Sequence, residues 1–137
     1  MNPLSILVAD DEDSIRSLVQ HLLSSNGHKV AVASNAPDAF EQMKLRQFDL
    51  VITDILMPDG DGVDLITELK KVQPDARILA MSGGGRYLEG SDYLKLAKGL
   101  GAHSAIKKPF TWQQLQKAID HALDQQPELG SREAALK

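Results

Sequence analysis

The 137-residue sequence contains no cysteine, which excludes a disulfide scaffold, a cysteine-ligated zinc site and a thiol nucleophile. Aromatic residues make up only 4% of the chain, with one tryptophan, so little is available to stack on a flavin or nucleotide ring. The net charge of −4 gives neither the basic footprint of a nucleic-acid-binding protein nor a polybasic membrane patch. No apolar stretch approaches the roughly 20 residues of a membrane span, and the N-terminus lacks the basic start of a signal peptide. We therefore expect a cytoplasmic protein that binds neither nucleic acid nor membranes.

What the sequence does contain is a regular alternation of short apolar runs and helical patterns. Five runs of the length typical of buried strands cover residues 5–9, 29–33, 49–53, 77–81 and 104–107. Apolar residues at helical spacing follow each run. This order predicts an α/β protein with a five-stranded parallel sheet, doubly wound with helices on both faces, in strand order 2-1-3-4-5. We expect one domain over residues 1–125 and a C-terminal tail over 126–137 that is partly flexible.

Several residues mark where the predicted helices begin and end. Asp11 is expected to be the N-cap of the first helix, and Thr111 that of the last. Pro37 opens the second helix. Gly27 and Gly101 stand where the first and fourth helices are expected to stop.

Polar side chains stand at the carboxyl ends of four of the five predicted strands. The first strand leads into Asp10 and Asp11, the third into Asp54, the fourth into Ser82 and the fifth into Lys108. In a parallel sheet these ends share one edge, and ligands bind there where the strand order reverses. The placement on different strands therefore predicts that three carboxylates, a hydroxyl and an ammonium converge.

The chemistry of this set indicates phosphoryl transfer with a bound cation. Three neighbouring carboxylates repel one another unless a cation neutralises them. Oxygen ligands without histidine or cysteine favour a hard ion, Mg²⁺ before Ca²⁺. Because Mg²⁺ needs only one or two carboxylates, one aspartate is left to act, and Asp54 is placed to attack phosphorus and form an aspartyl phosphate. Lys108 would pair with phosphoryl oxygens as a point charge, and Ser82 would donate a hydrogen bond.

Four motifs resemble those of one family. They are ILVADDE, DLVITDILMPDGDG, LAMSG and IKKPF, and they occur in this order across residues 4–124. Together they resemble the response-regulator receiver domain of bacterial two-component signalling, in particular the single-domain chemotaxis-type regulators. The resemblance implies a flavodoxin-like fold, and a phosphoryl group received from a phosphohistidine of a sensor histidine kinase or histidine phosphotransfer protein.

The resemblance also assigns roles to individual residues. It makes Asp54 the phospho-acceptor, Ser82 the switch hydroxyl and Lys108 the lysine of the site, with a cis Lys108–Pro109 bond. The implied magnesium ligands are Asp10 (through water), Asp11, Asp54 and the backbone carbonyl of Leu56. The sequence carries no output domain, so we expect a monomer or weak phosphorylation-dependent dimer that acts through a surface of the fourth helix, fifth strand and fifth helix. That surface would include Tyr93, Leu94, Ala97, Ala105, Lys107, Gln114 and Lys117.

Two features depart from the family's usual pattern. Receivers of this kind carry Tyr or Phe three residues before the lysine, and this sequence has Ala105, so a signal cannot be read through an aromatic side chain there. The loop after Ser82 begins with three glycines at 83–85, whose backbone freedom makes reordering sterically easy. We hypothesise that this loop, with Tyr87, replaces the aromatic switch.

Other interpretations remain. Asp11 and Asp54 would be only a helix cap and a turn residue if the site did not assemble, and Asp59, Asp61, Glu12 and Asp13 are interpreted as solvated acids. The histidines His21, His28, His103 and His121 show no metal spacing and are interpreted as surface or edge residues. An aspartate-based phosphohydrolase would place a second Asp two residues after the nucleophile, where this chain has Leu56. A flavin- or nucleotide-binding module and a degenerate receiver used only for docking are the remaining alternatives.

Overall fold

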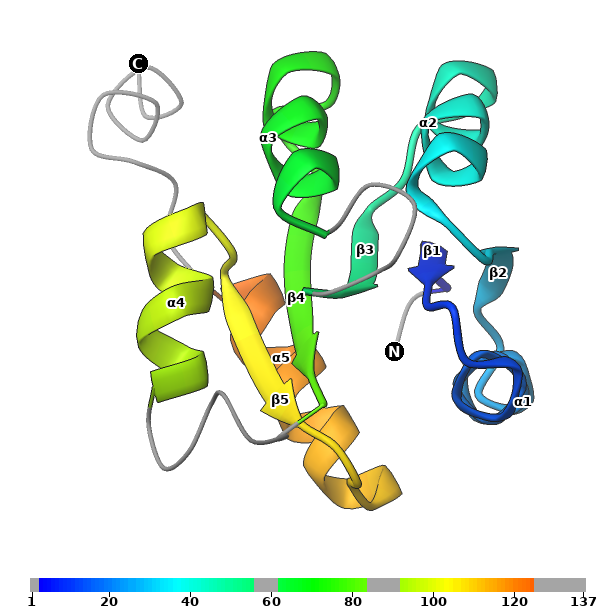
Figure 1. The fold of residues 1–137 in the computed structure, drawn as a ribbon. Coiled ribbons are helices and arrows are strands. Elements are labelled where there is room, and N and C mark those ends of the chain that lie inside the picture. Colours follow the sequence, from blue (N-terminus) through cyan, green and yellow to red (C-terminus); the bar gives the residue numbers. More distant parts are fainter. Residues whose placement is uncertain (1–2, 56–61, 84–91, 125–137) are drawn as a thin grey trace, which may run out of the picture.

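Five strands alternate with five helices in a computed structural model that describes residues 3–55, 62–83 and 92–124 (Figure 1). All strand pairs are parallel, and the sheet order is β2-β1-β3-β4-β5. This confirms the predicted architecture and strand order. The elements are β1 (Ser5–Ala9), α1 (Asp13–Ser25), β2 (Lys29–Ala33), α2 (Ala36–Leu45), β3 (Leu50–Asp54), α3 (Gly62–Val72), β4 (Arg77–Ser82), α4 (Asp92–Leu100), β5 (Ser104–Lys107) and α5 (Trp112–Asp124).

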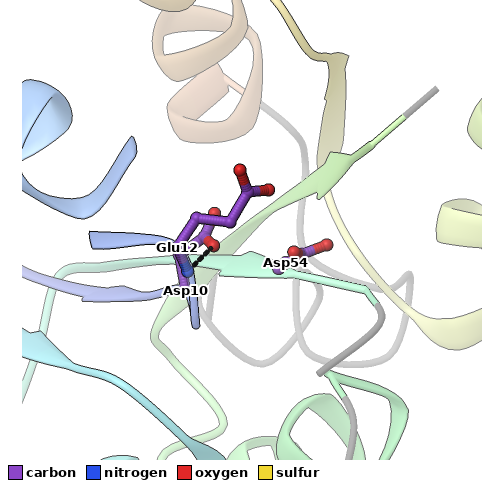
Figure 2. Close-up of side chains that lie close together, drawn as sticks. All are labelled: Asp10, Glu12 and Asp54. Carbon is purple, nitrogen blue, oxygen red and sulfur yellow. Dashed lines mark hydrogen bonds between the residues drawn. The ribbon is translucent and has the colours of Figure 1, made fainter. Parts of the chain in front are cut away.

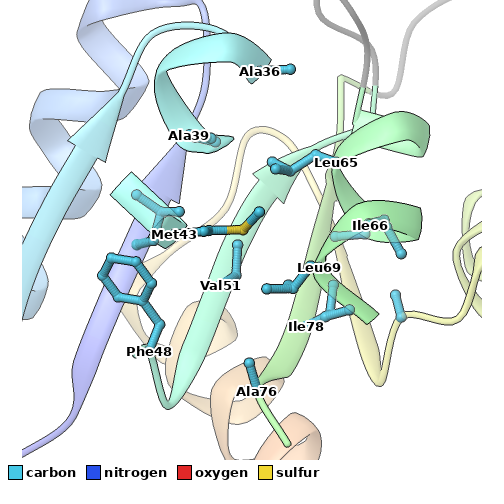
Figure 3. Packing of buried hydrophobic residues seen from close by; sticks show 14 of the residues in the cluster. Ala36, Ala39, Met43, Phe48, Val51, Leu65, Ile66, Leu69, Ala76 and Ile78 are labelled. Atoms are coloured by element: carbon cyan, nitrogen blue, oxygen red, sulfur yellow. The ribbon is translucent and has the colours of Figure 1, made fainter. Parts of the chain in front are cut away.

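Successive side chains of each strand point to opposite faces, so the sheet separates two hydrophobic cores. In β1, Leu7 packs with α2, α3 and α4 on one face, whereas Ile6 packs with α1 and α5 on the other. Figure 3 shows the first core, where Met43 of α2 and Leu69 of α3 meet Val51 of β3. Burial on both faces explains why the central strands are continuous apolar runs rather than alternating ones.

The helix ends follow the sequence signals in most places. Thr111 and Gln114 form a reciprocal capping box at the start of α5, with N–H···O distances of 2.9 and 3.1 Å. Gly27 and Gly101 have φ values of 90° and 103°, which only glycine adopts readily after a helix.

The predicted N-cap of the first helix is wrong. Helix α1 begins at Asp13, so Glu12 rather than Asp11 is at the N-cap, and the Glu12 side chain makes no capping bond. The turn is held instead by Asp10, whose Oδ1 accepts from the backbone N–H of Glu12 at 2.9 Å. The helix therefore begins one residue later than an N-cap at Asp11 would set it.

Two buried polar side chains secure the opposite, amino-terminal edge of the sheet. Gln73 is 4% exposed; its Oε1 accepts from the N–H of Phe48, and its Nε2 donates to the carbonyls of Met43 and Arg46, each at 2.9 Å. His28 is also buried, so of the two predicted positions, surface or edge, it takes the edge, and its Nδ1 accepts from the N–H of Leu4 at 3.0 Å. Both side chains tie segments that are distant in sequence.

His103 precedes β5, the edge strand opposite β2, and like His28 it accepts a hydrogen bond from a backbone N–H. Its Nδ1 accepts from the N–H of Ile78 at 3.0 Å, so this nitrogen must be unprotonated. Burial, with the positive charges of Arg77 and Lys70, lowers the pKa of His103 to about 4. The imidazole is therefore neutral at physiological pH. None of the described helices is long and apolar enough to cross a membrane.

Candidate functional site

The predicted site residues meet at the carboxyl edge of the sheet. Ala9 of β1 pairs with Thr53 of β3, which places the next residue of each strand, Asp10 and Asp54, side by side. Ser82 ends β4 and pairs with Lys107 of β5, one residue before Lys108. The backbone N–H of Lys108 donates to the carbonyl of Ser82 at 2.8 Å, and the Lys108–Pro109 bond is cis as expected. Four strands therefore deliver their polar ends to one place.

The ammonium of Lys108 lies at the centre of the site. Its Nζ is 2.7 Å from Asp10 Oδ2, 3.1 Å from Asp54 Oδ2 and 3.3 Å from Glu12 Oε1. Burial alone would lower the pKa of Lys108, but the close contact with Asp10 and the negative charges of Asp54 and Asp10 outweigh it and raise that pKa above its usual value. Lys108 is thus a permanent cation held by carboxylates.

Asp10 is the most buried member of the site. Its side chain is fully shielded from solvent, and its Oδ2 lacks a hydrogen bond of good angle among the described residues. We assign Lys108 as the partner of this oxygen nevertheless, because opposite charges 2.7 Å apart attract strongly in a buried place at any angle. Breaking this pair would leave a carboxylate without compensation.

The structure brings together a different acidic set from the one predicted. Carboxylate oxygens of Asp10, Glu12 and Asp54 lie within 4.8 Å of one another (Figure 2). Glu12, interpreted from the sequence as a solvated acid, belongs to the site although its side chain is 55% exposed. Asp11 is exposed and is not in this group, so its predicted role as a direct magnesium ligand stays a prediction.

One sequence signal points to Glu12: it directly follows the acidic pair Asp10 and Asp11. In the structure Glu12 is the N-cap of α1, so its side chain starts where the chain turns back from the edge of the sheet. Its extra methylene, compared with aspartate, lets the carboxylate reach Lys108. Leu56, Asp59, Asp61, Gly84, Gly85, Tyr87 and residues 126–137 lie outside the described residues.

The donor set fits a hard divalent cation. Three carboxylates carry a formal charge of about −3, and Lys108 neutralises only one of them. All the side-chain ligands are oxygen atoms, which Mg²⁺ and Ca²⁺ prefer over softer metals. The arrangement can therefore hold a metal ion beside the Asp54 carboxylate.

The model of the response regulator receiver domain matches residues 6–120. The chain belongs to this family. Receiver domains are the phospho-accepting parts of two-component response regulators, which agrees with the resemblance in the sequence. The receiver domain of this chain is 37% identical over 124 residues to the DNA-binding transcriptional regulator NtrC of Azospirillum brasilense, covering 90% of this chain and 25% of that protein. The chain thus spans about a quarter of the length of this curated relative.

Two solved structures indicate how receiver domains occur elsewhere. The chemotaxis response regulator CheY4 of Vibrio cholerae is 25% identical, with a TM-score of 0.79, covering 89% of this chain and all of that one. The beryllofluoride-activated NtrC4 receiver domain, a dimer in solution, is 32% identical with a TM-score of 0.76, covering 88% of this chain and 96% of that one. The same fold therefore occurs in other chains of receiver size.

Proposed function

We propose that this receiver domain is a signalling switch of the cytoplasm in which Asp54 accepts a phosphoryl group from a phosphohistidine. The donor is a sensor histidine kinase or a histidine phosphotransfer protein. The observation that carries the proposal is the position of Asp54 at the end of the central strand β3, with its Oδ2 3.1 Å from Lys108 Nζ and beside two further carboxylates. The residues around Asp54 are those that phosphoryl transfer to an aspartate requires.

In the reaction, an Asp54 carboxylate oxygen attacks phosphorus while the bond from phosphorus to the histidine nitrogen breaks. The leaving nitrogen keeps the electron pair of the broken bond, and the phosphoryl group stays on Asp54 as an aspartyl phosphate. Lys108 shifts from its carboxylate partners to the phosphoryl oxygens, which carry more negative charge. Ser82, at the end of the neighbouring strand, donates its hydroxyl to another phosphoryl oxygen.

Magnesium would be held by Asp10, Asp54, Asp11 and the Leu56 carbonyl, as the resemblance implies, and Glu12 is a further candidate from the structure. Bound Mg²⁺ supplies the positive charge that lets an anionic phosphoryl group approach an acidic site. The chain's own contribution is to fix Asp54 at the end of β3 and Lys108 directly after β5, with β4 between them, at one edge of the sheet, so that little reorganisation is needed.

We further propose that the protein turns over no external substrate and catalyses only its own phosphorylation and dephosphorylation. Its output goes through the surface of α4, β5 and α5. Ala97 does not belong to that surface, contrary to the sequence prediction, because it is 1% exposed and packs in the core. The protein is a monomer or a weak phosphorylation-dependent dimer, and the dimer formed by the beryllofluoride-activated NtrC4 receiver domain supports the second alternative.

Intact mass after incubation with acetyl phosphate tests the proposal. Wild-type protein should gain one phosphoryl group in the presence of Mg²⁺ and none in the presence of a chelator. Asp54→Asn should gain none, whereas Asp75→Asn, a change at an exposed aspartate outside the site, should behave as wild type. Far-ultraviolet circular dichroism checks that both variants are folded. A gain that survives in Asp54→Asn would place the acceptor elsewhere and refute the proposal.

A further inference from the structure

A groove of about 460 Å³ opens on the surface formed by α4, β5 and α5. Helices α4 and α5 both contact β5, the edge strand of the sheet, and Figure 1 shows β5 next to α4. Ala105 of β5 and Ala118 of α5 line the groove, and their short side chains leave it hollow. A large residue at position 105 would fill this space, so the groove exists because the chain has alanine there.

The walls of the groove are positively charged. Lys98 of α4, Lys107 of β5 and Lys117 of α5 line it; all three are exposed, and none forms an ion pair with another described residue. No acidic residue is among the described residues that line it. This contrasts with the chain as a whole, whose net charge is −4. A basic, partly apolar hollow on an acidic protein attracts a partner of opposite charge.

We infer that this groove binds an acidic segment of a partner protein that carries one large apolar side chain. The apolar side chain would occupy the hollow over Ala105 and Ala118, where contact removes it from water. Carboxylates on either side of it would pair with Lys98, Lys107 and Lys117. The inference rests on the proposed function, because it identifies the chemistry of the partner that reads the switch.

A nucleic acid is the other anionic ligand to consider, and the lining argues against it. Binding of single strands relies on aromatic side chains that stack on the bases. His121 supplies the one ring among the described lining residues, which include no Phe, Tyr or Trp, and the positive charge is confined to one short groove. An apolar floor surrounded by separate lysines suits a peptide better than a phosphate backbone.

Binding of a synthetic peptide, followed by NMR of ¹⁵N-labelled protein, tests the inference. The probe is a short peptide in which Asp and Glu flank a Leu-Phe pair, titrated against free and beryllofluoride-loaded protein. Two further peptides, one with Lys in place of the acids and one with Ala in place of Leu-Phe, control for charge and for the apolar anchor. A single-stranded oligonucleotide controls for general attraction of anions. Lys107→Glu and Lys117→Glu are compared with Lys29→Glu, an exposed lysine on the far edge strand β2.

We expect the acidic Leu-Phe peptide to shift resonances of Ala105 and Ala118, and the other two peptides to bind more weakly. Reversing both Lys107 and Lys117 should weaken binding about tenfold, since exposed ion pairs each contribute modestly, while Lys29→Glu should leave it unchanged. Tighter binding of the oligonucleotide or the basic peptide, shifts outside the groove, or no binding in either state would overturn the inference. Acetyl phosphate labelling of the same samples separates the two ideas: labelling without peptide binding refutes only the inference, and no labelling refutes the proposed function.

Discussion

Replacing Lys108 by methionine removes the positive centre of the site while keeping a side chain of similar length. Asp10 and Lys108 are 0% and 7% exposed, so the variant leaves a buried carboxylate without its partner. Removing one member of a buried ion pair costs about 3–5 kcal/mol. We expect a loss near 3 kcal/mol for the free energy of unfolding without Mg²⁺, because Glu12 is 55% exposed and adds little.

Urea unfolding, with and without Mg²⁺, measures this prediction. Because three carboxylates then lack a competing cation, Mg²⁺ should stabilise Lys108→Met more than it stabilises wild type. Lys107→Met, a change at the exposed neighbour, should stay within about 0.5 kcal/mol of wild type. If Lys108→Met proved as stable as wild type in a chelator, the carboxylates would not depend on this lysine and our account of the site would be wrong.

Three further predictions concern residues away from the site. Gln73→Ala leaves three backbone groups without their partner and should lower the free energy of unfolding by about 3 kcal/mol. Gln20→Ala on the surface of α1 should change it little, and urea unfolding of both variants measures the difference. Between pH 6.5 and about 4 the unfolded chain binds a proton at His103 that the native protein does not, so stability falls as pH falls. His103→Gln should lose about 2 kcal/mol less over this range, and equal losses would contradict the assigned role. Gly101→Ala should lower the melting temperature, because its φ is 103° and a Cβ would meet Lys70, while Gly99→Ala in α4 should raise it by helix propensity.

The sheet and most of the site were predictable because both depend on local patterns. Continuous apolar runs identify strands buried on both faces, and parallel strands present their carboxyl ends at one edge. Asp54, Ser82 and Lys108 were found by this rule alone, since each directly ends or follows a strand.

The residues that sequence reasoning missed depend on contacts between distant segments. Gln73 bonds groups 25 to 30 positions away, and His28 bonds Leu4 from 24 positions away, so no local pattern indicates their burial. Glu12 was missed for a related reason: its reach to Lys108 spans 96 positions. Asp11 was mistaken for a cap because the residue type alone does not say at which residue the helix begins: the turn held by Asp10 delays the start of α1 to Asp13.

The ion pairs of the site can form only late in the synthesis of the chain. Lys108 follows the last strand, whereas its partners Asp10 and Asp54 come from the first and third, so a ribosome synthesises both acids long before the lysine. A nascent chain in which β5 has not yet left the ribosome therefore carries Asp54 without Lys108. Under the proposed function, such a chain cannot draw phosphoryl groups away from finished regulators, and competence to receive a signal arrives with completion of the fold.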